Sequence, residues 1–128
     1  MKKLTVKDLF EKKGKKKLTE LYVTNALEAR AAETVGIDIL IVSFNKETLK
    51  TGVQTNKWFR DAHVSDIRSA ASNTFMIYGL GQLSSKEKAI DAALVARDNG
   101  ADAVYCGNSP SYIEALRKEG LPAVSHIG

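Results

Sequence analysis

The sequence of 128 residues contains a single cysteine, Cys106, so no disulfide bond can form within the chain. One lone cysteine is typical of proteins from a reducing compartment. No apolar run approaches the roughly 18 to 20 residues of a membrane span, and the Lys-rich N-terminus lacks the apolar core of a signal peptide. We therefore expect a cytoplasmic protein that does not contact the membrane.

Aromatic residues make up only 7% of the chain, and this bears on the net charge of +4. Residues 1–17 hold eight lysines against Asp8 and Glu11, whereas the remaining residues hold 11 basic and 13 acidic side chains. The basic charge therefore belongs to one N-terminal arm. A lysine cluster with Phe10 as its only aromatic residue lacks the stacking side chains of a single-strand binding surface, which argues against nucleic acid as a partner.

No Gly-x-Gly-x-x-Gly phosphate loop occurs either. With 44% hydrophobic and 27% charged residues, the composition is that of one globular domain over residues 1–128. Residues 1–17 form the basic helical arm at the start of this domain. Thr5 is positioned to cap a helix there, with Val6, Leu9 and Phe10 on its apolar side.

The most informative stretch is GIDILIVSFN, residues 36–45, in which six of ten residues are apolar. Such a run predicts a strand buried on both faces, as in a parallel sheet covered by helices. The other expected strands are residues 18–24, 75–80, 101–106 and 122–128. The later helices are expected at residues 25–35, 64–71, 84–98 and 109–119. Asn25 is the expected cap of the first of these helices, and Ser84 is the expected cap of the third.

Between them, residues 46–63 form a polar connection without a clear period, which is typical of a functional loop. Trp58 and Phe59 would anchor this loop to the body or cover a ligand.

Strands alternating with helices favour an α/β fold with parallel strands. Two architectures fit the spacing: the first five strands of a (β/α)8 TIM barrel, or a five-stranded flavodoxin-like open sheet. In either, functional residues gather where strands end. We expect Asn25, Ser43, Asn45, Tyr105 and Asn108 to bind a ligand there and His126 to be the candidate catalytic group, while Cys106 is a small buried hydrophobe.

Three segments resemble the N-terminal half of the ketopantoate hydroxymethyltransferase family, in the phosphoenolpyruvate mutase and isocitrate lyase superfamily. They are residues 29–43, residues 84–104, and Leu121-Pro-Ala-Val-Ser-His-Ile-Gly, which is similar to the family's fifth strand with its His-Leu-Gly ending. The resemblance implies a (β/α)8 barrel and chemistry on a small α-keto acid, with Mg²⁺ and methylene-tetrahydrofolate as cofactors if the family chemistry survives.

In that family two aspartates at the ends of strands two and three hold the magnesium ion. Val42-Ser43-Phe44-Asn45 stands where the family has Val-Gly-Asp-Ser, so Phe44 occupies the position of the first aspartate. Gly79 stands at the second, and Tyr105-Cys106-Gly107 replaces Lys-Ile-Glu on the fourth strand. The resemblance therefore implies that no metal ligands remain at these positions.

Eight βα units need roughly 200 to 250 residues, and this chain ends directly after the fifth predicted strand. We expect a fragment of a longer protein, a homo-oligomer or partner chain that completes the barrel, or an open sheet. Two functions follow from the sequence: a hydroxymethyltransferase-like enzyme for a small oxo-acid, or a non-catalytic half-barrel completed by a partner.

Overall fold

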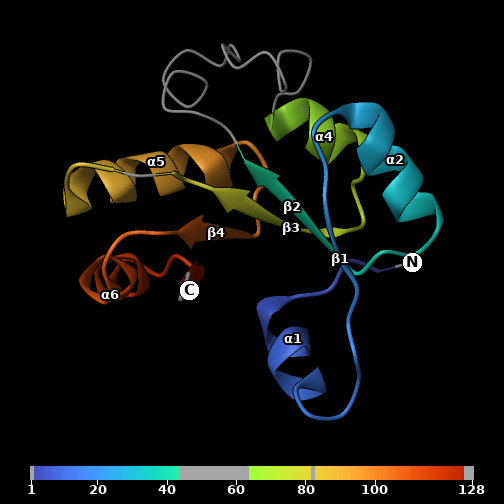
Figure 1. Cartoon of the computed structure of the whole chain (residues 1–128), viewed down its shortest axis with the longest axis horizontal. Coiled ribbons are helices and arrows are strands. Elements are labelled where there is room, and N and C mark those ends of the chain that lie inside the picture. Colours follow the sequence, from blue (N-terminus) through green and yellow to red (C-terminus); the bar gives the residue numbers. More distant parts are fainter. Residues whose placement is uncertain (1, 44–63, 82, 126–128) are drawn as a thin grey trace.

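The computed structural model describes residues 2–43, 64–81 and 83–125, and in them strands alternate with helices around one parallel sheet (Figure 1). The strands are β1 (Glu20–Tyr22), β2 (Ile39–Ser43), β3 (Phe75–Gly79), β4 (Ala103–Cys106) and β5 (Ala123–Ser125). The helices are α1 (Val6–Lys12), α2 (Ala26–Thr34), α4 (Val64–Ala70), α5 (Lys86–Asp98) and α6 (Pro110–Lys118). The predicted loop at residues 46–63, with Trp58 and Phe59, lies outside the described residues.

The order of the strands distinguishes the two predicted architectures. All neighbours in the sheet are parallel, and the spatial order is β1-β2-β3-β4-β5, the same as the order along the chain. A flavodoxin-like sheet has the order 2-1-3-4-5, because its chain reverses direction after the first strands. The sheet therefore winds in one direction, as part of a (β/α)8 barrel does, and the flavodoxin-like alternative is wrong.

The outer face of the sheet carries the main core. Leu40 and Val42 of β2 are buried there. Alanines supply much of the facing helix surface, which lets the helices approach the sheet closely; those of α5 are Ala89, Ala93 and Ala96, all fully buried. Because successive side chains of a strand point to opposite faces, Ile41, between Leu40 and Val42, faces inward.

The inner face has a second, smaller core beneath α1. Ile39, Phe75, Ile77 and Ala103 form it, and side chains from the basic N-terminal segment pack against them. The packed side chains of that segment are Leu4, Val6, Leu9 and Leu18. Since Ile39, Phe75 and Ala103 are the first residues of their strands, α1 covers the amino end of the sheet and leaves the carboxyl end open to other residues.

Local capping explains where two of the helices begin. The Thr5 hydroxyl accepts a hydrogen bond from the Asp8 amide, and the Asp8 carboxylate accepts one from the Thr5 amide, a reciprocal capping box at α1. At α5 the expected cap, Ser84, is wrong by one residue: Ser85 caps it, accepting from the Lys88 amide at 3.2 Å. Adjacent serines have the same capping chemistry, so the sequence could not separate them.

None of the helices within the described residues is long and apolar enough to cross a membrane.

Candidate functional site

Backbone register brings residues from four strands to one level at the carboxyl end of the sheet. Ser43 pairs with Gly79, Gly79 with Tyr105, and Tyr105 with Val124. Tyr105 and Val124 are paired in this way and share the inner face of the sheet. This level, Ser43–Gly79–Tyr105–Val124, is the described part of the candidate site, and we call it the carboxyl level.

Tyr105 is the predicted ligand-binding residue whose place best suits that role. Its side chain is half-buried and packs against the inner-face core, while its carbonyl oxygen accepts a hydrogen bond from the Leu80 amide at 2.9 Å. The strand position is thus fixed while the phenol ring lies near the carboxyl end of β4, the end of the strands at which a barrel binds its ligands.

Asn25 follows β1 in the chain and acts as the N-cap of α2. Its Oδ1 accepts a hydrogen bond from the Glu28 amide at 2.8 Å, and the Glu28 carboxylate accepts one from the Thr24 amide at 2.7 Å. The capping role predicted for Asn25 is confirmed. Its amide oxygen is therefore occupied, and a ligand role stays a prediction.

Asn108 also has structural partners. Its Oδ1 accepts from the Leu83 amide at 3.2 Å, and its Nδ2 donates to the Leu83 carbonyl at 3.0 Å. This two-point contact ties the segment after β3 to the segment after β4, so Asn108 shapes the carboxyl end of the sheet through the loop it holds.

We expect Asn108→Ala to lower the free energy of unfolding by about 1 to 3 kcal/mol, because two hydrogen bonds to one backbone residue are lost. Asn108→Asp is the matched control for donor loss: it keeps an acceptor for the Leu83 amide but replaces the amino group that donates to the Leu83 carbonyl. Urea unfolding of both variants measures the effect. An unchanged midpoint for Asn108→Ala would contradict the clamping role.

Two other reactive side chains near this end point away from the inner face. Cys106 is buried, as predicted, with its sulfur 3.7 Å from Asn108 Oδ1. Tyr78 is fully buried in the outer core, and burial raises the pKa of its phenol well above the usual range. Both side chains lie in the outer core and therefore do not face the carboxyl level.

The remaining predicted site residues, Asn45 and His126, and the position of Phe44 lie outside the described residues. Their roles stay predictions. Within residues 2–43, 64–81 and 83–125, no cluster of three His, Cys, Asp or Glu side chains is placed to hold a metal ion. The residue types at the carboxyl level, a serine, a glycine, a tyrosine and a valine, include no carboxylate.

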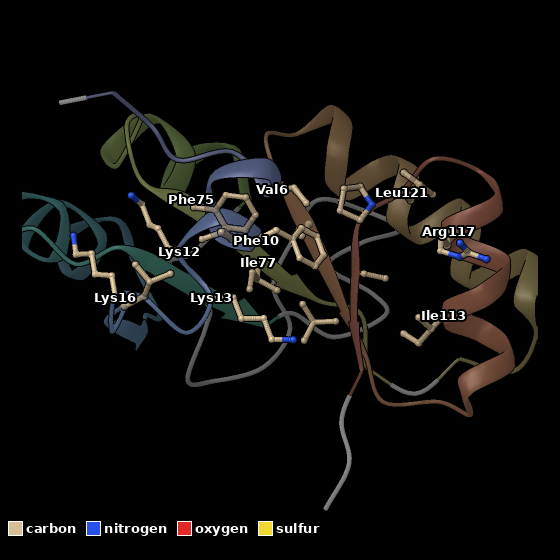
Figure 2. A pocket seen from close by; sticks show the side chains of 16 residues that line it. Val6, Phe10, Lys12, Lys13, Lys16, Phe75, Ile77, Ile113, Arg117 and Leu121 are labelled. Atoms are coloured by element: carbon tan, nitrogen blue, oxygen red, sulfur yellow. The ribbon is translucent and has the colours of Figure 1, made fainter.

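A second feature, not predicted from the sequence, lies on the inner face of the sheet and extends from its amino end to Val124. A groove of about 610 Å³ opens between α1, the inner face of the sheet, β5 and α6. Figure 2 shows Val6 and Phe10 of α1 approaching it from one side, Phe75 and Ile77 from the sheet, and Ile113 of α6 from the other side. The spacing of Val6, Leu9 and Phe10 predicted an apolar helix face, but only the fold reveals that part of this face meets open space.

Known proteins resemble this chain over nearly its whole length. The 3-methyl-2-oxobutanoate (ketopantoate) hydroxymethyltransferase of Staphylothermus marinus is 29% identical over 138 aligned positions, which include 100% of this chain and 51% of that enzyme. The enzyme of Thermotoga neapolitana is 30% identical, over 98% of this chain and 50% of the enzyme. The predicted family resemblance is confirmed.

The chain spans about half the length of these ketopantoate hydroxymethyltransferases, as expected for a likeness to one half of the barrel. The Bacillus subtilis enzyme shows the same relation, with 28% identity over 78% of this chain and 40% of the enzyme. No protein-family profile matches the chain.

The fold has a counterpart among solved structures. A provisionally assigned deoxyribose-phosphate aldolase from Coccidioides immitis superposes with a TM-score of 0.54 at 19% identity, over 78% of this chain and 43% of the aldolase chain. This likeness concerns the fold alone, and it supports a partial (β/α) barrel.

Proposed function

We propose that the chain is a ketopantoate hydroxymethyltransferase-like half-barrel that binds a small oxo-acid at its carboxyl end without the magnesium ion of the family. The observation that carries this proposal is the carboxyl level, where Gly79 lies between Ser43 and Tyr105 in the register. A cytoplasmic location, expected from the sequence, is part of the proposal.

The donor set argues against magnesium. Mg²⁺ is a hard cation that proteins bind through carboxylate oxygens in near-octahedral geometry. The family resemblance assigns Phe44 and Gly79 to the two aspartate positions, and a phenyl ring and a hydrogen atom donate no electron pair to a metal ion. The residues present therefore do not fit Mg²⁺, and we derive no metal-dependent step for this chain.

Neutral hydrogen-bonding groups are the candidates for ligand binding. The proposed set is Ser43, Asn45, Tyr105 and His126, with Asn25 and Asn108 holding the surrounding backbone. Hydroxyl, amide and imidazole groups can donate to the keto and carboxylate oxygens of an oxo-acid. His126 is the proposed proton-transferring group, since histidine is the one residue type in this set that ordinarily gains or loses a proton near neutral pH.

Calorimetric titration with 3-methyl-2-oxobutanoate, in the presence and absence of Mg²⁺, tests the proposal. We expect the same heat with and without the metal ion, because no carboxylate is available to bind it at the Phe44 and Gly79 positions. The Bacillus subtilis relative, titrated in parallel, is the positive control for a metal-dependent signal. Micromolar binding to this chain that requires Mg²⁺ would overturn the proposal.

A second candidate function is assembly: a non-catalytic half-barrel completed by a partner chain. The groove beside α1 favours it, since the groove lies on the inner face of the sheet and reaches Val124 on the last strand. In a complete barrel later strands would cover this face.

A further inference from the structure

We propose that a second copy of this chain closes the sheet into a barrel, with β5 of each copy pairing with β1 of the other. This inference rests on the assembly candidate and names its partner. It does not depend on whether the carboxyl level binds Mg²⁺.

The two ends of the sheet are open strands. Within the described residues β1 and β5 each have one neighbouring strand, because they are first and last in the sheet order. All three residues of β1 are exposed, as are Val124 and Ser125 of β5. An exposed edge strand presents backbone N–H and C=O groups that can pair with a further strand.

Exposed apolar side chains gather on the same two edges. Leu21 and Tyr22 on β1 are 43% and 46% exposed, and Val124 on β5 is 40% exposed. Leu27, in the helix that directly follows β1, is 79% exposed, and Phe10, which lines the groove next to β5, is 72% exposed. Apolar side chains grouped in this way are typical of surfaces that another protein covers.

Opposite charges would meet if β1 of a second copy joined β5. The groove is lined by Arg117 of α6, on the side of β5, and by Lys12, Lys13 and Lys16 on the side of α1 (Figure 2). At the β1 edge Glu20 is paired with Ile39 in the register and therefore lies on the inner face. A second copy that adds its β1 to β5 would bring the Glu20 carboxylate toward these cations and Tyr22 toward the apolar wall.

Symmetry favours a second copy over a separate segment. A segment of another protein that adds one strand to β5 leaves β1 open. Two copies related by a two-fold axis along the barrel keep all strands parallel and cover both edges of both copies at once. The product is a closed barrel of ten strands, wider than one of eight because the diameter grows with strand number, with room at the amino end for two copies of α1.

Light scattering on the eluting protein measures the mass in solution. We expect the wild-type chain to have twice the monomer mass of 14.0 kDa. Val124→Lys is expected to weaken dimerisation by at least about tenfold, because it places a charge in the strand junction. Val95→Lys is the matched control: Val95 is 41% exposed on α5, away from both edges, and its replacement should leave the dimer unchanged.

A mixing experiment separates this dimer from other modes of association. Leu21→Lys and Val124→Lys each damage both junctions of their own dimers, but a mixed dimer retains one junction with two unmodified edges. Equal mixtures should therefore associate more strongly than either variant alone, with circular dichroism confirming that both are folded. The inference would be overturned if the wild-type chain were monomeric at about 50 µM, a concentration at which weak dimers form. It would also be overturned if Val124→Lys and mixing left the dimer unchanged.

Discussion

Replacing Arg68 with alanine is expected to lower the free energy of unfolding by about 3 to 5 kcal/mol, the cost of breaking a buried ion pair by removing one partner. The Arg68 guanidinium connects α4 to the amino end of the sheet. Nη2 lies 2.7 Å from Asp102 Oδ2, Nε donates to the Gly100 carbonyl at 2.9 Å, and Nη1 donates to the carbonyls of Ala71 and Thr74 at 2.9 and 2.8 Å.

The large effect follows from burial of both charges. The side chains of Arg68 and Asp102 are only 16% and 14% exposed. The same Asp102 oxygen accepts from the Met76 amide at 2.9 Å, and Lys3 pairs with the other oxygen. Without Arg68 the Asp102 carboxylate loses the planar guanidinium group that donates to it. Three backbone carbonyls lose the same hydrogen-bond donor.

Arg97→Ala is the control for removing an arginine from an ion pair. Arg97 and Asp98 form an exposed pair, with side chains 57% and 67% exposed, and such pairs contribute about 0 to 1 kcal/mol. Urea unfolding of both variants measures the difference. Equal losses of stability would show that the Arg68 cluster is no more than a surface pair.

Gly100 belongs to the same cluster for a geometric reason. Its φ of +109° is a backbone conformation that side chains disfavour, and a Cβ atom there would lie 2.6 Å from Arg68 Cγ. The glycine therefore lets the arginine pass close to the turn before β4.

Leu40→Ala is expected to lower the free energy of unfolding by about 2 to 5 kcal/mol, because it leaves a cavity in the outer core. Leu40 is fully buried at the centre of that core, between the paired residues Leu21 and Met76 of the neighbouring strands. The next residue, Ile41, is half-buried on the inner face and packs at the margin of the smaller core.

Ile41→Ala is the matched control, since it shortens a similar side chain on the same strand. We expect it to cost less than Leu40→Ala, because a side chain that is already partly in solvent loses fewer contacts. Thermal or urea unfolding of the two variants compares the faces directly. Equal losses would contradict the description of the inner face as an incompletely covered core.

The sequence predicted well where local chemistry decides. The run GIDILIVSFN predicted a strand buried on both faces because both of its faces are apolar. In the structure Leu40 and Val42 belong to the core on the outer face of the sheet, and Ile39 belongs to the core on the inner face. The Asn25 cap was predictable because a cap and its helix are adjacent in the chain.

Contacts between distant residues were not predictable in this way. Asn108 reaches Leu83 across 25 residues, and Arg68 reaches Asp102 across 34. The groove depends on how α1 and α6 lie relative to the sheet, which no periodicity in either helix specifies. Choosing between the barrel and the flavodoxin-like sheet likewise required the spatial order of strands, since both give the same alternation along the chain.

The most direct test of the central claim, that the carboxyl level holds no family-type metal ion, is site-resolved. Mn²⁺, a paramagnetic ion that accepts the same oxygen ligands as Mg²⁺, broadens the NMR signals of nearby amides. The amide signals of Ser43, Gly79 and Tyr105 are followed as Mn²⁺ is added together with 3-methyl-2-oxobutanoate. We predict no selective broadening of these three signals relative to the amides of α5. Selective broadening that Mg²⁺ reverses would contradict the account.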